Sequence, residues 1–87
     1  MVVERFRDGN ARPVYERARD RGRMLPQGLR YVDSWVEASL SRCFQLMECD
    51  DARLLQDWLL NWNDLMECEI VPVVPSKETR ELVESRL

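Results

Sequence analysis

The sequence predicts a small α+β domain in which a four-stranded antiparallel sheet carries two helices on one face. Three observations lead to this fold class. Residues 50–74 combine a helix of strong apolar periodicity with a strand that follows it directly. Two runs rich in Val, Tyr, Trp and Phe, at 29–37 and 42–49, follow each other closely in the sequence before that stretch. A strand followed by a helix also opens the chain, within residues 1–22.

The first strand is expected at 1–6, because MVVERF is β-branched and aromatic and ends just before an Asp-Gly turn. Asn10 then caps a helix in which the early Pro13 costs no hydrogen bond, and Gly22 ends it. The predicted inner side of this helix is Ala11, Val14, Tyr15 and Ala18, and the predicted outer side is Arg12, Arg17, Arg19 and Arg23.

The two middle strands are expected to form a hairpin whose loop is Ala38-Ser39-Leu40-Ser41. With this loop, an ion pair and an aromatic pair both fall opposite each other, which favours the register. The predicted pairs on one face are Glu37 with Arg42, Trp35 with Phe44, Asp33 with Leu46, and Tyr31 with Glu48. The other face then holds Val32, Val36, Cys43, Gln45 and Met47.

Asp50 or Asp51 caps the second helix, whose apolar residues fall in one arc with the exception of Leu60. The arc is Ala52, Leu54, Leu55, Leu59, Trp58 and Trp62. We expect Trp58 and Trp62 to be core residues and not a stacking platform for a ligand.

The fourth strand is expected at 65–74, and it contains Pro72. Proline has no backbone N–H to donate to a ladder, so this strand should lie at an edge of the sheet. Ser76 begins a last short helix with a thin apolar side. The order of strands and helices is that of the ferredoxin-like fold, βαββαβ, in which the fourth strand pairs with the first.

We expect one domain over residues 1–87, with 75–87 as a C-terminal helix or tail. No apolar run approaches the roughly 20 residues that span a bilayer, and no charged-then-apolar leader precedes the first strand, so we expect a cytoplasmic protein without membrane contact. The first strand starts abruptly at Met1, which leaves a longer natural N-terminus open. The three cysteines are interpreted as reduced core residues.

Composition limits the chemistry that the chain can perform. Histidine is absent, which removes the commonest general base and metal ligand, and no metal or cofactor is expected. The net charge is −3, but residues 1–30 carry eight Arg against four acids. Because acids are interspersed with these arginines, we interpret them as a solvated helix face and expect no nucleic acid partner.

The face of the sheet that the two helices leave open is expected to be apolar. Val3, Trp35, Phe44, Leu46, Val71 and Val73 cannot all lie under two helices. A large exposed apolar area on a small domain usually marks an interface or a ligand groove. We therefore expect this face to pack against the same face of a second copy, which makes the protein a homodimer.

A resemblance supports this expectation. The stretches MVVERF (1–6), GLRYVDSW (28–35), CFQLMECDD (43–51) and NWNDLMECEIVPV (61–73) resemble a family of small bacterial proteins known only as a domain of unknown function. The resemblance implies membership of the dimeric α+β barrels, ferredoxin-like domains that pair sheet to sheet. Some relatives carry a histidine directly after the tryptophan that matches Trp35, whereas this chain has Val36. Chemistry that depends on that imidazole is not expected here.

The candidate ligand-binding residues are those that the proposed register gathers on one face: Tyr31, Asp33, Trp35, Phe44 and Glu48. Aromatic walls enclosing a desolvated carboxylate would suit a small molecule or a general base. The favoured function is a non-catalytic homodimeric module that binds a ligand or a protein. The alternative is a cofactor-independent enzyme of the dimeric barrel type, acting through Asp33 or Glu48 in an aromatic pocket.

Three other functions find little support. Glu67 and Glu69 project the same way along the fourth strand, but without further ligands a solvated edge is the simpler interpretation. Haem degradation would lack the usual histidine ligand. RNA binding by the sheet would need aromatics with basic neighbours, and only Phe6 and Phe44 are placed for it.

Overall fold

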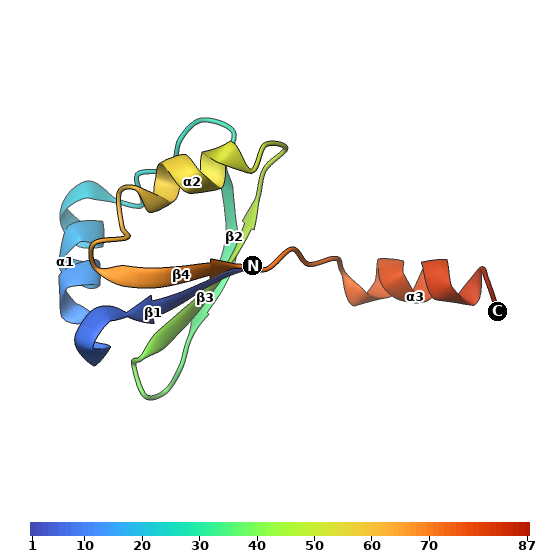
Figure 1. Ribbon diagram of the computed structural model, residues 1–87, viewed down its shortest axis with the longest axis horizontal. Coiled ribbons are helices and arrows are strands. Elements are labelled where there is room, and N and C mark those ends of the chain that lie inside the picture. Colours follow the sequence, from blue (N-terminus) through green and yellow to red (C-terminus); the bar gives the residue numbers. More distant parts are fainter.

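The chain adopts the predicted βαββαβ order and adds one helix at its C-terminus (Figure 1). The computed structural model describes all residues from 1 to 87. Its elements are β1 (Val2–Phe6), the single-turn 3-10 helix η1 (Arg7–Gly9), α1 (Arg12–Arg21), β2 (Arg30–Val36), β3 (Arg42–Glu48), α2 (Arg53–Leu59), β4 (Met66–Ile70) and α3 (Ser76–Glu84). The sheet order is β2-β3-β1-β4 with antiparallel neighbours throughout, so the ferredoxin-like topology is confirmed.

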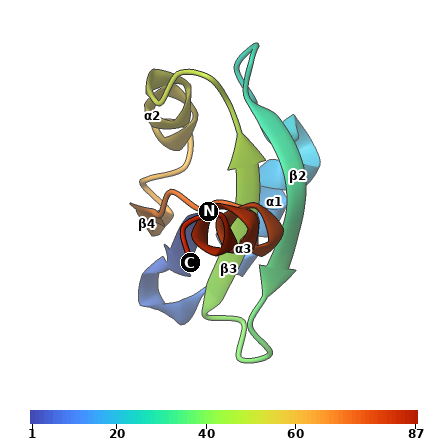
Figure 2. The same ribbon diagram turned by 90° about the vertical axis from the view of Figure 1, so that its right-hand side faces the viewer.

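The two faces of the sheet differ because successive side chains of a strand point to opposite sides. In β1, Val2, Glu4 and Phe6 are buried under the helices, whereas Val3 and Arg5 belong to the other side. Figure 2 shows β2 and β3 with α1 behind them and α3 in front. One face is therefore covered by α1 and α2, and the opposite face, here called the open face, is not.

Helix α2 supplies the centre of the core, as predicted. Trp58 and Trp62 are 2% and 4% exposed and pack with Val2, Leu29 and Met66. Both indole N–H groups donate to the backbone carbonyl of Arg23, at 2.8 and 3.1 Å, so burying them leaves no polar atom without a partner. The exceptional Leu60 is 72% exposed.

The predicted capping residues lie directly before the N-cap positions, which Ala11 and Ala52 occupy. The Asn10 side chain accepts a hydrogen bond from the Arg12 N–H at 3.2 Å, and the Asp51 side chain accepts one from the Arg53 N–H at 2.9 Å. Gly22 follows α1 with a φ of 69°, a conformation that costs glycine little.

The predicted hairpin register is confirmed next to the loop and is wrong at the end of the strands away from the loop. Trp35 pairs with Phe44 and Asp33 with Leu46, and the Glu37 N–H donates to the Arg42 carbonyl at 2.9 Å. The register then shifts between Tyr31 and Asp33, so that Tyr31 pairs with Met47 and Arg30 with Glu48. Val32 is the extra residue of this irregularity, which moves Tyr31 to the helix-covered face.

Two further expectations need correction. Strand β4 lies at an edge as predicted, but it ends at Ile70, so Pro72 lies outside it. The last contact of this edge is the Val71 N–H, which donates to the Met1 carbonyl at 2.8 Å. Arg17 does not face outward but crosses to Trp62 and Asp64. Arg23 is exposed as predicted, and its guanidinium lies over the Tyr31 ring.

Candidate functional site

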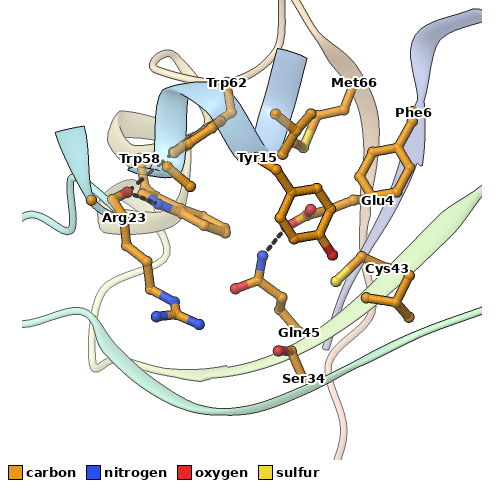
Figure 3. A pocket seen from close by; sticks show the side chains of 14 residues that line it. Glu4, Phe6, Tyr15, Arg23, Ser34, Cys43, Gln45, Trp58, Trp62 and Met66 are labelled. Atoms are coloured by element: carbon orange, nitrogen blue, oxygen red, sulfur yellow. Dashed lines mark hydrogen bonds between the residues drawn. The ribbon is translucent and has the colours of Figure 1, made fainter. Parts of the chain in front are cut away.

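A cavity of about 210 Å³ lies between the helices and the covered face of the sheet (Figure 3). Its apolar walls come from β1, α1, α2 and β4: Phe6, Val14, Ala18, Trp58, Trp62 and Met66. Two other lining residues, Tyr15 and Val36, are 53% and 38% exposed, so the cavity opens to solvent between α1 and the end of β2. An apolar hollow with a few convergent polar groups is the usual form of a small-molecule site.

The polar centre of the cavity is Glu4, which is only 1% exposed. Burial raises the pKa of this carboxyl to about 7, although a hydrogen bond from Gln45 and the positive charge of Arg23 both lower it. Glu4 lies in the middle of β1 because it shares its parity with Val2 and Phe6. At neutral pH the cavity therefore holds a carboxyl group that is poised between its neutral and charged forms.

Gln45 faces Glu4 from β3 and donates a hydrogen bond from Nε2 to the carboxyl oxygen Oε1. The other end of the same amide, Gln45 Oε1, is buried and accepts no hydrogen bond. A buried acceptor without a donor costs free energy, on the order of 1–3 kcal/mol. An N–H or O–H group of a ligand in the cavity could donate to this acceptor.

Arg23 and Ser34 complete the polar lining, and both connect it to Tyr31. The Arg23 guanidinium carbon lies 3.6 Å from the centre of the Tyr31 ring. The Tyr31 and Ser34 hydroxyl groups are hydrogen-bonded at 2.6 Å. These contacts order the side of the cavity that faces β2.

The cysteine in the cavity is not activated as a nucleophile. Burial and, to a lesser extent, the nearby Glu4 raise the pKa of the Cys43 thiol to about 11, although the charge of Arg23 lowers it. The thiolate is the reactive form of cysteine, and it is scarce at neutral pH when the pKa is so high. Cys43 therefore acts as a small wall residue, which agrees with its expected place in the core.

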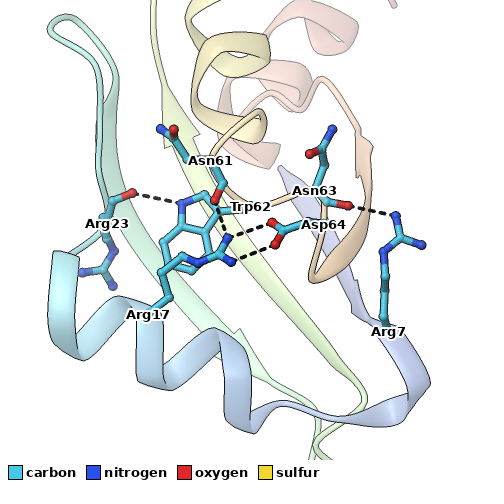
Figure 4. A network of polar contacts seen from close by, with 7 residues as sticks. All are labelled: Arg7, Arg17, Arg23, Asn61, Trp62, Asn63 and Asp64. Carbon is cyan, nitrogen blue, oxygen red and sulfur yellow. Dashed lines mark hydrogen bonds and ion pairs between the residues drawn. The ribbon is translucent and has the colours of Figure 1, made fainter.

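A second group of polar contacts joins α1 and η1 to the turn after α2, beside this cavity (Figure 4). The guanidinium of Arg17 in α1 donates to both carboxyl oxygens of Asp64, at 2.7 and 2.8 Å, and to the Asn61 carbonyl at 2.8 Å. Its carbon also lies 5.7 Å from the centre of the Trp62 ring. Arg7 donates to the Asn63 carbonyl at 2.9 Å. Both arginines hold the turn after α2 in position. Trp62, which belongs to this turn, forms a wall of the cavity.

The structure divides the five residues expected to form a ligand site. Asp33, Trp35, Phe44 and Glu48 lie on the open face, and Tyr31 lies on the covered face because of the register shift. None of the five lines the cavity, although Tyr31 contacts two residues that do. Asp33 is exposed, and Glu48 forms an ion pair with Arg30 at 3.0 Å in which both side chains are exposed.

Sequence reasoning missed Glu4 and Gln45 as site residues. A signal was present in each strand. Glu4 alternates with the apolar Val2 and Phe6, and Gln45 alternates with Cys43 and Met47, so each puts a polar group at a position of buried parity. The pairing of Val2 with Gln45 across the neighbouring strands then sets the two polar groups side by side.

No group of three or more Cys, Asp and Glu side chains is placed to hold a metal ion. No helix has the length and apolar character needed to cross a bilayer.

The topology and the cavity together define a ferredoxin-like α+β domain with an acidic pocket beneath its helices. The whole chain, residues 1–87, matches the family described as domain of unknown function DUF3303, and the protein belongs to that family. No characterised protein and no solved structure matches the chain significantly.

Proposed function

We propose that this protein is a homodimeric, non-catalytic module of the dimeric α+β barrel type that binds a small molecule in the cavity around Glu4. The observation that carries the proposal is the buried, unpartnered acceptor Gln45 Oε1 beside a carboxyl group of pKa about 7. Both groups lie in a mostly apolar cavity that opens to solvent.

The cavity limits the ligand by size and by polarity. Its 210 Å³ is below the roughly 300–1,000 Å³ of sites for drug-sized molecules, so the ligand is small. Gln45 Oε1 requires a hydrogen-bond donor, and Trp58 and Trp62 present apolar ring surface because their N–H groups are already used by Arg23. The ligand class is a small, uncharged, mostly apolar molecule with at least one O–H or N–H group.

The open face supports the homodimer. Trp35, Phe44 and Val3 lie side by side across three strands, and Trp35 is 52% exposed. Charged residues border this apolar row at the loop end: Glu37, Arg42, Arg5 and Glu67. An apolar centre within a charged border is the usual anatomy of an interface.

Two matched probes test the ligand site. Phenol carries an O–H donor, whereas anisole has a methyl group in its place. We expect phenol to shift the NMR signals of Glu4 and Gln45 saturably, and to bind about tenfold more tightly than anisole, because one hydrogen bond to a buried acceptor contributes about 1.4 kcal/mol. Gln45→Met should abolish the preference, and Gln56→Met on the exposed side of α2 should keep it. Signals that do not shift, or equal affinity for the two probes, would contradict the proposal.

The raised pKa of Glu4 also favours the alternative of a cofactor-independent enzyme. In that case the general base is Glu4, because Asp33 and Glu48 lie outside the cavity. Binding requires only the cavity and its donor site, whereas catalysis requires a reacting group in addition. The binding function is therefore the one proposed.

A further inference from the structure

The cavity beneath the helices contains two hydrogen-bonding groups without a partner in the protein, and they are of opposite kinds. The first is the buried acceptor Gln45 Oε1. The second belongs to Glu4, which is 1% exposed and receives its hydrogen bond from Gln45 at Oε1, so that its other oxygen, Oε2, is left without one. A neutral carboxyl group carries an O–H donor. On Glu4 this proton resides on Oε2, because Oε1 already receives the amide N–H of Gln45.

The two groups do not satisfy each other. In Figure 3 the nitrogen end of the Gln45 amide points to Glu4, and the oxygen end therefore points away from the carboxyl group. The Arg23 guanidinium also lines the cavity, but its carbon lies 3.6 Å from the centre of the Tyr31 ring, and it donates to neither group. A buried donor and a buried acceptor without partners both cost free energy. A ligand that brings one acceptor and one donor would satisfy both.

We propose that the ligand carries a hydrogen-bond acceptor as well as a donor, that neutral Glu4 donates its O–H to this acceptor, and that binding therefore favours the protonated protein. Gln45 Oε1 receives the ligand's donor. This inference rests on the proposed ligand site and does not involve the homodimer. The chemical class that combines a carbonyl oxygen and an N–H group without net charge in so small a volume is the amide, open-chain or cyclic. Loss of the Glu4 proton removes the donor and places a negative charge beside the ligand's carbonyl oxygen.

Glu4 is the group of the cavity whose charge changes between pH 5.5 and pH 8.5. Cys43 of β3 and Cys68 of β4 lie directly opposite Glu4 on the neighbouring strands, and burial raises the pKa of their thiols to about 11 and about 12. Tyr15 faces Glu4 from α1, and burial raises its pKa above the usual 10. Arg23 keeps its charge, as arginine does in proteins. Helix α2 brings no titratable side chain to the cavity, so a change of pH in this range tests Glu4.

Two five-membered rings test the inference. 2-Pyrrolidinone has an N–H and a carbonyl group, whereas pyrrole has an N–H group and no carbonyl. At pH 5.5 we expect 2-pyrrolidinone to bind about tenfold more tightly than pyrrole, because it makes one more hydrogen bond to a buried group. At pH 8.5 a carboxyl group with a pKa of about 7 is protonated in about 3% of the molecules, so the Kd of 2-pyrrolidinone should rise about tenfold or more. The affinity of pyrrole should not fall. Titration of the NMR signals of the Gln45 side-chain amide measures both Kd values.

Glu4→Gln separates the effect of the donor from the effect of the proton. The new side chain replaces the O–H by an N–H donor that is present at every pH. 2-Pyrrolidinone should therefore still bind this variant more tightly than pyrrole does, with the same Kd at pH 5.5 and pH 8.5. Glu69→Gln, on the open face of β4, is the matched control and should retain the pH dependence of the wild type.

The titration of Glu4 itself gives a readout that needs no variant. Binding and protonation are linked, so the ligand must change the affinity for the proton by the same factor as the proton changes the affinity for the ligand. Saturating 2-pyrrolidinone should raise the titration midpoint of the Glu4 carboxyl carbon by about one pH unit or more. Carbon-13 NMR of the wild type, with and without the ligand, measures this shift.

The outcomes separate this inference from the proposed ligand site. Failure of phenol to bind would overturn both. If phenol binds as proposed, this inference alone is overturned by a 2-pyrrolidinone affinity that equals that of pyrrole at pH 5.5, or by one that does not fall at pH 8.5. A Glu4 titration midpoint that 2-pyrrolidinone leaves unchanged or lowers would also overturn it.

Discussion

The two faces of the sheet carry the same kinds of residues with opposite physical consequences. Beneath the helices, Trp58 of α2 is 2% exposed, and burial raises the pKa of Glu4 in β1 to about 7. On the open face, Trp35 is 52% exposed, and the ion pair with Arg42 lowers the pKa of Glu37 to about 2. A tryptophan and a carboxylate thus stand on each side of the sheet, and they differ in exposure and in their neighbours.

The comparison shows what the helix layer adds to the sheet. Under the helices, an aromatic ring stabilises the fold, and a carboxylate loses its water and approaches neutrality. On the open face, the Trp35 ring remains half exposed to solvent, and the Glu37 carboxylate keeps its charge beside Arg42. The covered face therefore holds a desolvated carboxyl group, and the open face exposes apolar area beside charged residues.

The largest expected effect tests whether the tryptophans differ as their burial indicates. Trp58→Ala should lower the free energy of unfolding by about 3–5 kcal/mol, because it removes buried apolar area and leaves a cavity. Trp35→Ala should cost about 0.5 kcal/mol or less in the diluted protein, since the ring is half exposed there. Urea unfolding of the dilute protein, followed by circular dichroism, measures both. Equal losses would mean that the two faces are equally covered.

The second effect concerns Glu4 and has a definite sign. Its pKa rises from the usual 4.5 to about 7 on folding, so between these pH values the folded state holds a proton that the unfolded state has lost. Wild-type stability should therefore fall as the pH rises from about 4.5 to about 7, by on the order of 3 kcal/mol. Glu4→Gln should remove this part of the pH dependence, and Glu69→Gln on the open face of β4 should retain it. Urea midpoints at pH 5 and pH 8 measure how the stability of each variant depends on pH. A pH dependence of Glu4→Gln equal to that of the wild type would contradict the raised pKa.

Much of the fold could be predicted because its signals are local and repeated. The stripe of α2 places Trp58 and Trp62 in the core, and the opposed Glu37–Arg42 and Trp35–Phe44 pairs indicate the hairpin register. The shift at Val32 could not be predicted, because a single extra residue leaves no mark in an alternating pattern. That one residue moves Tyr31 to the face opposite Asp33, Trp35 and Phe44.

The site was harder to predict than the fold for a physical reason. A glutamate in the middle of a strand reads as an outward residue, since burying a charge is costly. Glu4 is tolerated inside because it approaches neutrality and receives a hydrogen bond from Gln45, which lies 41 residues away in the sequence. Only the pairing of β1 with β3 brings the two together.

The smallest effect is the counterpart of Glu4 on the open face and runs in the opposite direction. The Arg42 guanidinium donates to both Glu37 carboxyl oxygens at 2.8 Å, and this ion pair lowers the pKa of Glu37 from 4.5 to about 2. Its contribution to stability is therefore present above about pH 4.5 and is lost as the pH falls through about 2. Glu37→Gln should flatten the acid side of the stability curve and leave the change between pH 5 and pH 8 intact. Glu48→Gln, which breaks a more exposed pair with Arg30, should have less effect at acid pH. Urea midpoints at pH 5 and pH 2.5 distinguish the two variants, and an acid side left unchanged by Glu37→Gln would show that the ion pairs of the open face do not contribute to folding.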